Sequence, residues 1–183
     1  MLSDLQTRKL TRYFEVYDVD DDGRVQQSDF ERILENIRVL HGQGDGSPAY
    51  RSLREAYLAR WGALRAAADG DGDGGVDLDE WLGYWAGALS DDARYEAEAE
   101  AIADRLFAVF DLDEDGRIGA GEFEGFYGVF GLAVELARTV FEALDADGDG
   151  AITRDELLDL SREFYRGSDA GAAGNLLFGP FEP

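Results

Sequence analysis

Hydrophobic residues recur at every third or fourth position in several stretches of the chain, a spacing that predicts amphipathic α-helices. Three of these stretches are Leu10, Phe14 and Tyr17; Ile102, Leu106, Val109 and Phe110; and Val140, Phe141 and Leu144. Four more are Phe30, Ile33, Leu34 and Ile37; Trp81, Leu82 and Trp85; Phe123, Phe126, Tyr127 and Phe130; and Leu157, Leu160 and Phe164. We expect an all-α protein with helices near residues 3–17, 27–40, 49–67, 78–89, 91–110, 120–129, 132–144 and 154–166, with Ser90 capping the helix at 91–110.

Polar segments of one repeated form separate the helices in four places. They read "DVDDDGRVQQSD" (18–29), "DGDGDGGVDLDE" (69–80), "DLDEDGRIGAGE" (111–122) and "DADGDGAITRDE" (145–156). Each has Asp at positions 1, 3 and 5, Gly at position 6, a branched aliphatic residue at position 8 and an acid at position 12. Four copies in one register, flanked by helical patterns, are not explained by a composition rich in Asp and Gly.

The negative charge of the chain is concentrated in these four loops. They hold 21 of the 40 acidic residues but only 3 of the 17 Lys and Arg residues, and so carry −18 of the formal net charge of −23. Crowded carboxylates repel one another unless a cation neutralises them. The distribution therefore indicates four cation sites rather than a general excess of surface charge.

The loops offer the oxygen ligands that calcium requires, about six to eight for each ion. Acids at positions 1, 3, 5 and 12 and the backbone carbonyl at position 7 supply most of them, and a side chain or a water at position 9 completes the set. The candidate metal ligands are Asp18, Asp20, Asp22, Arg24 and Asp29; Asp69, Asp71, Asp73, Gly75 and Glu80; Asp111, Asp113, Asp115, Arg117 and Glu122; and Asp145, Asp147, Asp149, Ala151 and Glu156.

The residue types at positions 6 and 8 of each loop are explained by backbone conformation and by loop pairing. Glycine at position 6 permits a left-handed backbone that a Cβ atom would strain. The branched residues at position 8 suit short β-bridges between neighbouring loops, and they are Val25, Val76, Ile118 and Ile152. Capping boxes are expected where Asp77 precedes Glu80 and where Thr153 precedes Glu156.

The four loops resemble EF-hands, and their spacing resembles that of the sarcoplasmic calcium-binding proteins, including the calerythrin-like bacterial group. The loops begin 51, 42 and 34 residues apart, and the chain ends in "NLLFGPFEP". The resemblance implies a compact molecule with one EF-hand pair in residues 1–90, a second pair in residues 91–166, and a tail in residues 167–183 that packs between the two lobes. The enrichment in Ala, Gly, Arg and Asp favours a bacterial member.

The first loop departs from the pattern. It ends in Asp29, which is one methylene shorter than Glu, and has Gln26 at position 9. A shorter acid reaches the ion less easily with both oxygens, and this favours the octahedral shell of magnesium. We expect three to four bound calcium ions, with the first site the one that prefers magnesium. The alternatives for that site are weak calcium binding and no binding.

The composition argues against several classes of partner and indicates a cellular location. The strong negative charge argues against nucleic acid and against an anionic membrane surface. The chain has no cysteine, and it lacks both an apolar signal-peptide core and a long apolar run. We expect a soluble cytoplasmic protein, most simply a monomer, whose partners are calcium ions.

Three functions fit an EF-hand protein of this kind: a calcium buffer or transporter, a calcium sensor that regulates a partner protein, and a photoprotein-like oxygenase. The oxygenase needs several histidines around a chromophore, whereas the chain has only His41, in a glycine-rich turn that we expect to be exposed. We therefore expect no enzyme. Sensors use methionine-rich grooves, and Met1 is the sole methionine. We favour the buffer and keep the sensor as the alternative.

The apolar C-terminal tail bears on the choice between a calcium buffer and a calcium sensor. Leu176, Leu177, Phe178 and Phe181 would be poor residues for a solvated end. The Gly/Ala segment 167–174 is expected to be a flexible connector that lets the tail reach a groove. A groove that is filled by the chain itself is not free for a target helix.

Overall fold

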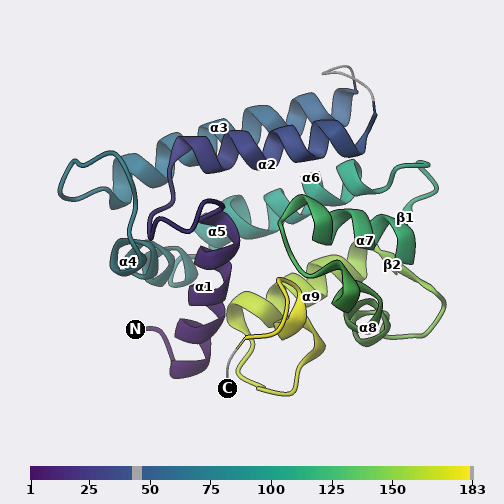
Figure 1. Cartoon of the computed structure of the whole chain (residues 1–183). Coiled ribbons are helices and arrows are strands. Elements are labelled where there is room, and N and C mark those ends of the chain that lie inside the picture. The colour runs from purple at the N-terminus through teal and green to yellow at the C-terminus, as the bar shows by residue number, and fades with distance from the viewer. Residues whose placement is uncertain (43–46, 182–183) are drawn as a thin grey trace.

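The computed structural model describes residues 1–42 and 47–181. The N-terminal half contains helices α1 (Asp4–Tyr17), α2 (Gln27–Leu40), α3 (Pro48–Ala68) and α4 (Leu78–Leu89). The C-terminal half contains α5 (Asp92–Tyr95), the π-helical turn η1 (Glu96–Glu100), α6 (Ala101–Phe110), strand β1 (Arg117–Gly119), α7 (Ala120–Val129), α8 (Val134–Leu144), strand β2 (Ala151–Thr153), α9 (Arg154–Arg166) and the 3₁₀ turn η2 (Ala173–Leu176). The mostly helical fold that the sequence predicts is confirmed (Figure 1).

Side-chain caps explain where several helices begin. Ser3 and Gln6 form a capping box at the start of α1, and the Ser47 hydroxyl accepts a hydrogen bond from the backbone N–H of Tyr50 at the start of α3. The prediction that Ser90 caps the helix after α4 is wrong, because Ser90 ends α4 and Asp91 supplies the cap. The Asp91 carboxylate accepts from the backbone N–H of Arg94 at 3.0 Å. A charged acceptor also suits the positive end of a helix dipole.

The loops pair as the position-8 residues predict. Val25 and Val76 exchange two backbone hydrogen bonds, of 2.9 and 3.0 Å, and so join the first loop to the second. Strands β1 and β2 join the third loop to the fourth in antiparallel register, with Ile118 opposite Ile152. These four side chains are buried at 5% exposure or less. Each lobe is therefore built around a pair of back-to-back loops.

The two lobes share one core. Helices α2 and α7 lie against each other, and the Asn36 side-chain amide donates to the Val129 carbonyl at 2.9 Å. A Cβ atom on Gly125 of α7 would lie 3.1 Å from a methyl group of Leu40 on α2, so glycine permits this close approach. Helix α1 packs on α9, and the fully buried Lys9 donates to the carbonyls of Glu163 and Gly167. Burial lowers the pKa of Lys9 to about 8, although the Glu163 carboxylate acts in the opposite direction.

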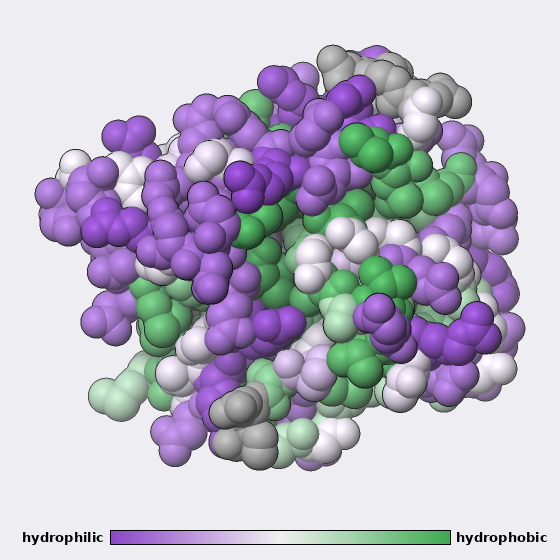
Figure 2. Space-filling model, viewed as in Figure 1, coloured by the Kyte–Doolittle hydropathy of each residue, from purple (hydrophilic) through white to green (hydrophobic). Residues whose placement is uncertain are grey.

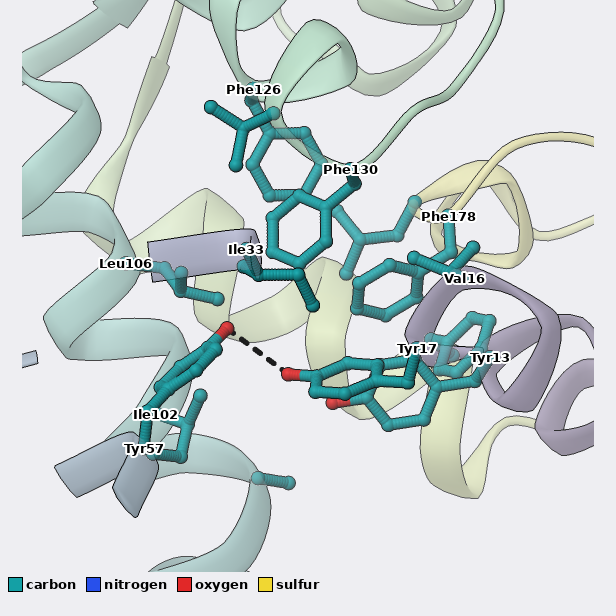
Figure 3. Close-up of a cluster of buried hydrophobic side chains, with 14 of the residues drawn as sticks. Tyr13, Val16, Tyr17, Ile33, Tyr57, Ile102, Leu106, Phe126, Phe130 and Phe178 are labelled. Atoms are coloured by element: carbon teal, nitrogen blue, oxygen red, sulfur yellow. Dashed lines mark hydrogen bonds between the residues drawn. The ribbon is translucent and has the colours of Figure 1, made fainter. Parts of the chain in front are cut away.

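The C-terminal segment lies between helices of both lobes. The Phe178 ring is 4.4 Å from the Tyr13 ring on α1 and 5.0 Å from the Phe164 ring on α9. It also lies near Phe126 on α7 and Phe130 directly after α7, and Figure 3 shows it among these buried side chains. Leu177 and Phe178 are buried, whereas Leu176 and Phe181 are half-buried. Residues 182–183 of the tail lie outside the described residues.

The Gly/Ala segment 167–174 is held in place by hydrogen bonds, although we expected a flexible connector. The Asn175 side-chain amide donates to the carbonyls of Asp169 and Ala170 at 2.9 and 3.1 Å. The backbone N–H of Gly174 donates to the Glu163 carboxylate at 2.8 Å, and a Cβ atom on Gly174 would lie 2.3 Å from the Leu160 carbonyl oxygen. Small residues in this segment thus serve close packing on α9 as well as conformational freedom.

The surface is largely hydrophilic on the face seen in Figure 2, with hydrophobic residues gathered towards the right of the view. Large exposed hydrophobic side chains include Val39, Leu112, Val134 and Leu136. Within residues 1–42 and 47–181, no helix is long and apolar enough to cross a membrane. His41 differs from our expectation: it is half-buried at the end of α2, and its Nε2 atom has no hydrogen-bond partner.

Candidate metal centre

The first ligand of every loop lies at the end of a helix. Asp18, Asp69, Asp111 and Asp145 terminate α1, α3, α6 and α8, and each backbone N–H closes the last helical turn. The second carboxylate oxygen of each accepts from the backbone N–H of the position-6 glycine, at 2.9 to 3.2 Å. This repeated bond curls the loop back on its own first residue.

Left-handed backbone occurs at two positions of every loop. The position-6 glycines have φ between +84° and +94°, as the sequence pattern predicts. Position 4 is also left-handed, with φ of +57° at Asp21, +74° at Gly72, +59° at Glu114 and +71° at Gly148. Sequence reasoning missed position 4. The only signal for it was glycine in the second and fourth loops, because Asp and Glu occupy the other two.

In the first three loops, the acid at position 12 bridges the beginning and the end of its loop, whereas Glu156 of the fourth loop accepts from the backbone N–H and the hydroxyl of Thr153. Glu122 accepts from the backbone N–H groups of Leu112 and Gly119, both at 2.7 Å. Glu80 likewise accepts from Gly70 and Asp77, at 2.7 and 3.1 Å. The predicted capping boxes of Asp77 with Glu80 and of Thr153 with Glu156 are present. Position 12 is thus held over the loop from the first turn of the following helix.

The closing acid of the first loop is more deeply buried than those of the other loops. Its shorter acid, Asp29, still accepts from both Val19 and Gln26, at 3.2 and 2.7 Å, and it is only 1% exposed. Burial raises the pKa of both Asp29 and Asp18, against the effect of their backbone hydrogen bonds. Neighbouring acids raise these pKa values further. A bound cation would offset both effects, since it favours the charged carboxylates.

Three acidic groups converge in each loop. In the first two loops, Asp18, Asp20 and Asp22 and then Asp69, Asp71 and Asp73 have carboxylate oxygens within 4.8 Å of one another. In the last two loops, Asp111, Asp113 and Glu122 and then Asp145, Asp147 and Glu156 converge in the same way. Four predicted acids lie outside these clusters: Asp29, Glu80, Asp115 and Asp149. The position-7 residues Arg24, Gly75, Arg117 and Ala151 lie beside the inter-loop bridges.

The donor set fits a hard divalent cation. One oxygen of Asp69, Oδ1, is buried and has no hydrogen-bond donor, although its partner Oδ2 accepts from Gly74. A buried carboxylate oxygen without a donor is costly unless a cation or a water meets it. Calcium binds such oxygens, and its function here would be to neutralise and order the loop.

Arginines from the first loop of each pair also contact acids of the second, which sequence reasoning did not anticipate. Arg24 pairs with Asp73, and Arg117 pairs with Asp149. The Gly75 backbone N–H and then Arg24 lower the pKa of Asp73. The signal that could have indicated these contacts is arginine at position 7 in the first and third loops alone.

Comparison with known proteins places this geometry in a family. The EF-hand family profile matches residues 11–34, 66–82, 102–127 and 137–161. Calerythrin from Saccharopolyspora erythraea is 23% identical over 169 residues, which cover 91% of this chain and 96% of calerythrin.

Two solved structures share the fold over nearly the whole chain. A sarcoplasmic calcium-binding protein from amphioxus has a TM-score of 0.75 and 26% identity, with complete coverage of both chains. A Streptomyces coelicolor calcium-binding protein has a TM-score of 0.73 and 24% identity, covering 90% of this chain and 99% of its own. The two solved structures are described as calcium-binding proteins, and the EF-hand matches of this chain indicate the same kind of loop. With four EF-hand loops in two bridged pairs, the chain belongs to the EF-hand family of calcium-binding proteins.

Proposed function

We propose that the protein is a calcium buffer. The observation that carries this proposal is the position of Phe178, which fills the space between Tyr13 of the first lobe and Phe164 of the second. A sensor must offer an apolar groove to its target when calcium binds. Here residues of the same chain occupy the region between the lobes.

The polar contacts of the tail support a fixed arrangement. Arg12 Nε donates to the Phe178 carbonyl at 3.0 Å, and Lys9 Nζ donates to Asn175 Oδ1 at 3.1 Å. Tyr127 of α7 donates to the Leu176 carbonyl at 3.3 Å. Release of the tail would break bonds to both lobes and would expose aromatic surface to water, so occupancy of the region by a second protein would be costly.

We propose three to four bound calcium ions per chain, with magnesium preferred in the first loop. The second, third and fourth loops end in Glu, whose length allows both oxygens to reach one ion. In the first loop, the buried Asp29 is already drawn between Val19 and Gln26. A short and buried acid suits a small ion with six ligands better than a larger ion with more.

The sensor remains the second candidate, because the similar Streptomyces coelicolor protein is described in terms of prokaryotic calcium-mediated regulation. A pull-down from cell lysate, in calcium and in EGTA, separates the two functions. The matched control carries Glu80→Gln, Glu122→Gln and Glu156→Gln together. A buffer retains no partner that depends on calcium. A protein retained by the natural chain in calcium, and lost with the control, would establish the sensor.

The volume of the interior cavity argues against a chromophore-dependent activity. The apolar cavity between α6, α7, α9 and the tail has a volume of about 40 Å³ and is lined in part by Tyr13, Phe126 and Phe178. Ligand pockets for drug-sized molecules are about 300–1,000 Å³.

We further propose a monomer in the cytoplasm of a bacterium, which size-exclusion chromatography with light scattering and cell fractionation would test.

A further inference from the structure

The same ion pair links the two loops of both lobes. Arg24, at position 7 of the first loop, donates through Nη1 to Oδ2 of Asp73, at position 5 of the second. Arg117, at position 7 of the third loop, donates through Nη1 to Oδ2 of Asp149, at position 5 of the fourth, at 2.7 Å. Because the contact recurs at equivalent positions of two lobes, we regard it as a characteristic feature of the loop pair.

Loop pairing explains why the contact runs in one direction only. Arg24 and Arg117 directly precede Val25 and Ile118, which form the bridges to the opposite loop. The corresponding residues of the second and fourth loops are Gly75 and Ala151, whose side chains cannot form an ion pair. A Cβ atom on Gly75 would lie 3.2 Å from Cδ of Arg24, so the glycine leaves room for the arginine.

The ion pair engages the carboxylate oxygen that the loop itself leaves available. In Asp73 and Asp149, Oδ1 accepts from the loop backbone, at 3.0 and 3.1 Å, and Oδ2 faces the arginine. In the first and third loops, the equivalent acids Asp22 and Asp115 have no ion pair among residues 1–42 and 47–181. The two loops of a pair therefore differ in the charge placed beside position 5.

We propose that Arg24 and Arg117 are tethered cations that compete with calcium in the second loop of each pair and so lower its affinity. A guanidinium beside a ligand carboxylate repels an incoming divalent ion and offsets part of the carboxylate charge that attracts it. In the ion-free protein, the same guanidinium relieves repulsion among the acids. The backbone carbonyl of the arginine belongs to the first site of the pair, so one residue serves both sites.

Arg24→Gln and Arg117→Gln test this competition, with Arg162→Gln as the matched control. Arg162 is also an exposed arginine in an ion pair, with Glu100 and Asp159, but it lies away from the loops. Competition titration against a chromophoric chelator should show calcium binding about two- to fivefold tighter in the second or fourth loop, the size expected of a partly exposed ion pair. The gain should shrink in about 1 M KCl, where charges are screened within about 3 Å.

Two further measurements separate competition from a merely structural contact. Arg24→Gln should lower the melting temperature in EDTA, although it tightens calcium binding, and Arg24→Lys should retain most of the natural behaviour. In a Glu80→Gln background, which weakens the second site, Arg24→Gln should no longer change calcium affinity. Weaker or unchanged calcium binding in Arg24→Gln, or an equal gain in Arg162→Gln, would overturn the proposal.

Discussion

Lys9 Nζ on the first helix lies 3.1 Å from Asn175 Oδ1 in the tail, across 166 residues of chain. The same ammonium donates to the carbonyls of Glu163 and Gly167, and it is completely buried. One side chain therefore holds the N-terminal helix, the end of α9 and the tail together. Three hydrogen bonds match the three donors of the ammonium group.

Replacement of Lys9 by methionine should destabilise the protein by about 2 kcal/mol, because the acceptors would be buried without donors. Chemical denaturation in saturating calcium measures this change. Arg8→Met is the control, since Arg8 is adjacent in sequence and exposed. Equal stability of the two variants would show that the Lys9 contacts do not stabilise the fold.

Phe178→Ala should be far more damaging than Phe181→Ala. Phe178 is 4% exposed and packs on four aromatic rings, so truncation should cost about 3–5 kcal/mol. Phe181 is half-buried and should cost less. Thermal melting and binding of the dye ANS measure the two effects. Deletion of residues 175–183 should reproduce the Phe178→Ala phenotype; a truncated protein with the natural melting temperature and no extra dye binding would contradict the role given to the tail.

Isothermal titration should detect at least three calcium ions per chain, because three loops have a full acidic set ending in Glu. Glu122→Gln should selectively weaken the third site, since it removes a charge from one of the converging clusters. Four bound ions would change the formal charge from −23 by eight units and relieve repulsion. Fewer than three sites in the natural protein would refute the assignment.

Asp29→Glu should raise the preference of the first site for calcium over magnesium. The longer acid restores a closing ligand that can bind with both oxygens. Titrations of both ions measure the ratio of affinities, with Asp79→Glu as a control for the added methylene at an exposed position. A ratio that matches the control would mean that Asp29 does not determine ion preference.

Stability should fall as the pH rises above about 10. Burial raises the pKa of Tyr84, Tyr95 and Tyr127 to about 12, and raises those of Tyr17, Tyr57 and Tyr165 further. In the unfolded chain these tyrosines ionise near pH 10, whereas in the fold they keep their protons, so ionisation favours unfolding by about 1 kcal/mol per tyrosine at pH 11.

Lys9 acts in the opposite direction between pH about 8 and 10, because its folded pKa is the lower one. Absorbance at the tyrosinate band and denaturant titrations across this range measure both effects. Tyrosines that titrate near pH 10 while the protein remains folded would contradict the predicted burial effect.

Local sequence determined the helices and the loops, and it indicated the position-8 residues through which the loops pair. These features depend on residues close together in the chain: aspartates at alternate positions, glycine where φ is positive, and a branched residue at position 8. The predicted bounds of the helices at 27–40, 78–89, 120–129 and 154–166 agree with the structure. The prediction that Ser90 caps the helix after α4 was wrong, because Asp91 offers a charged acceptor one residue later.

Only the tertiary structure decided how the lobes meet and which charges are buried. Lys9 is an ordinary helix residue in sequence, yet α9 and the tail bring it three acceptors. Arg60 lies on α3 with its guanidinium 5.3 Å from the Trp85 ring and 3.7 Å from the Glu98 carboxylate. Arg24 and Asp73 are 49 residues apart and meet because their loops pair. Such contacts depend on the distance between elements remote in the chain, which no local pattern of residues encodes, whereas coordination loops are encoded within twelve consecutive positions.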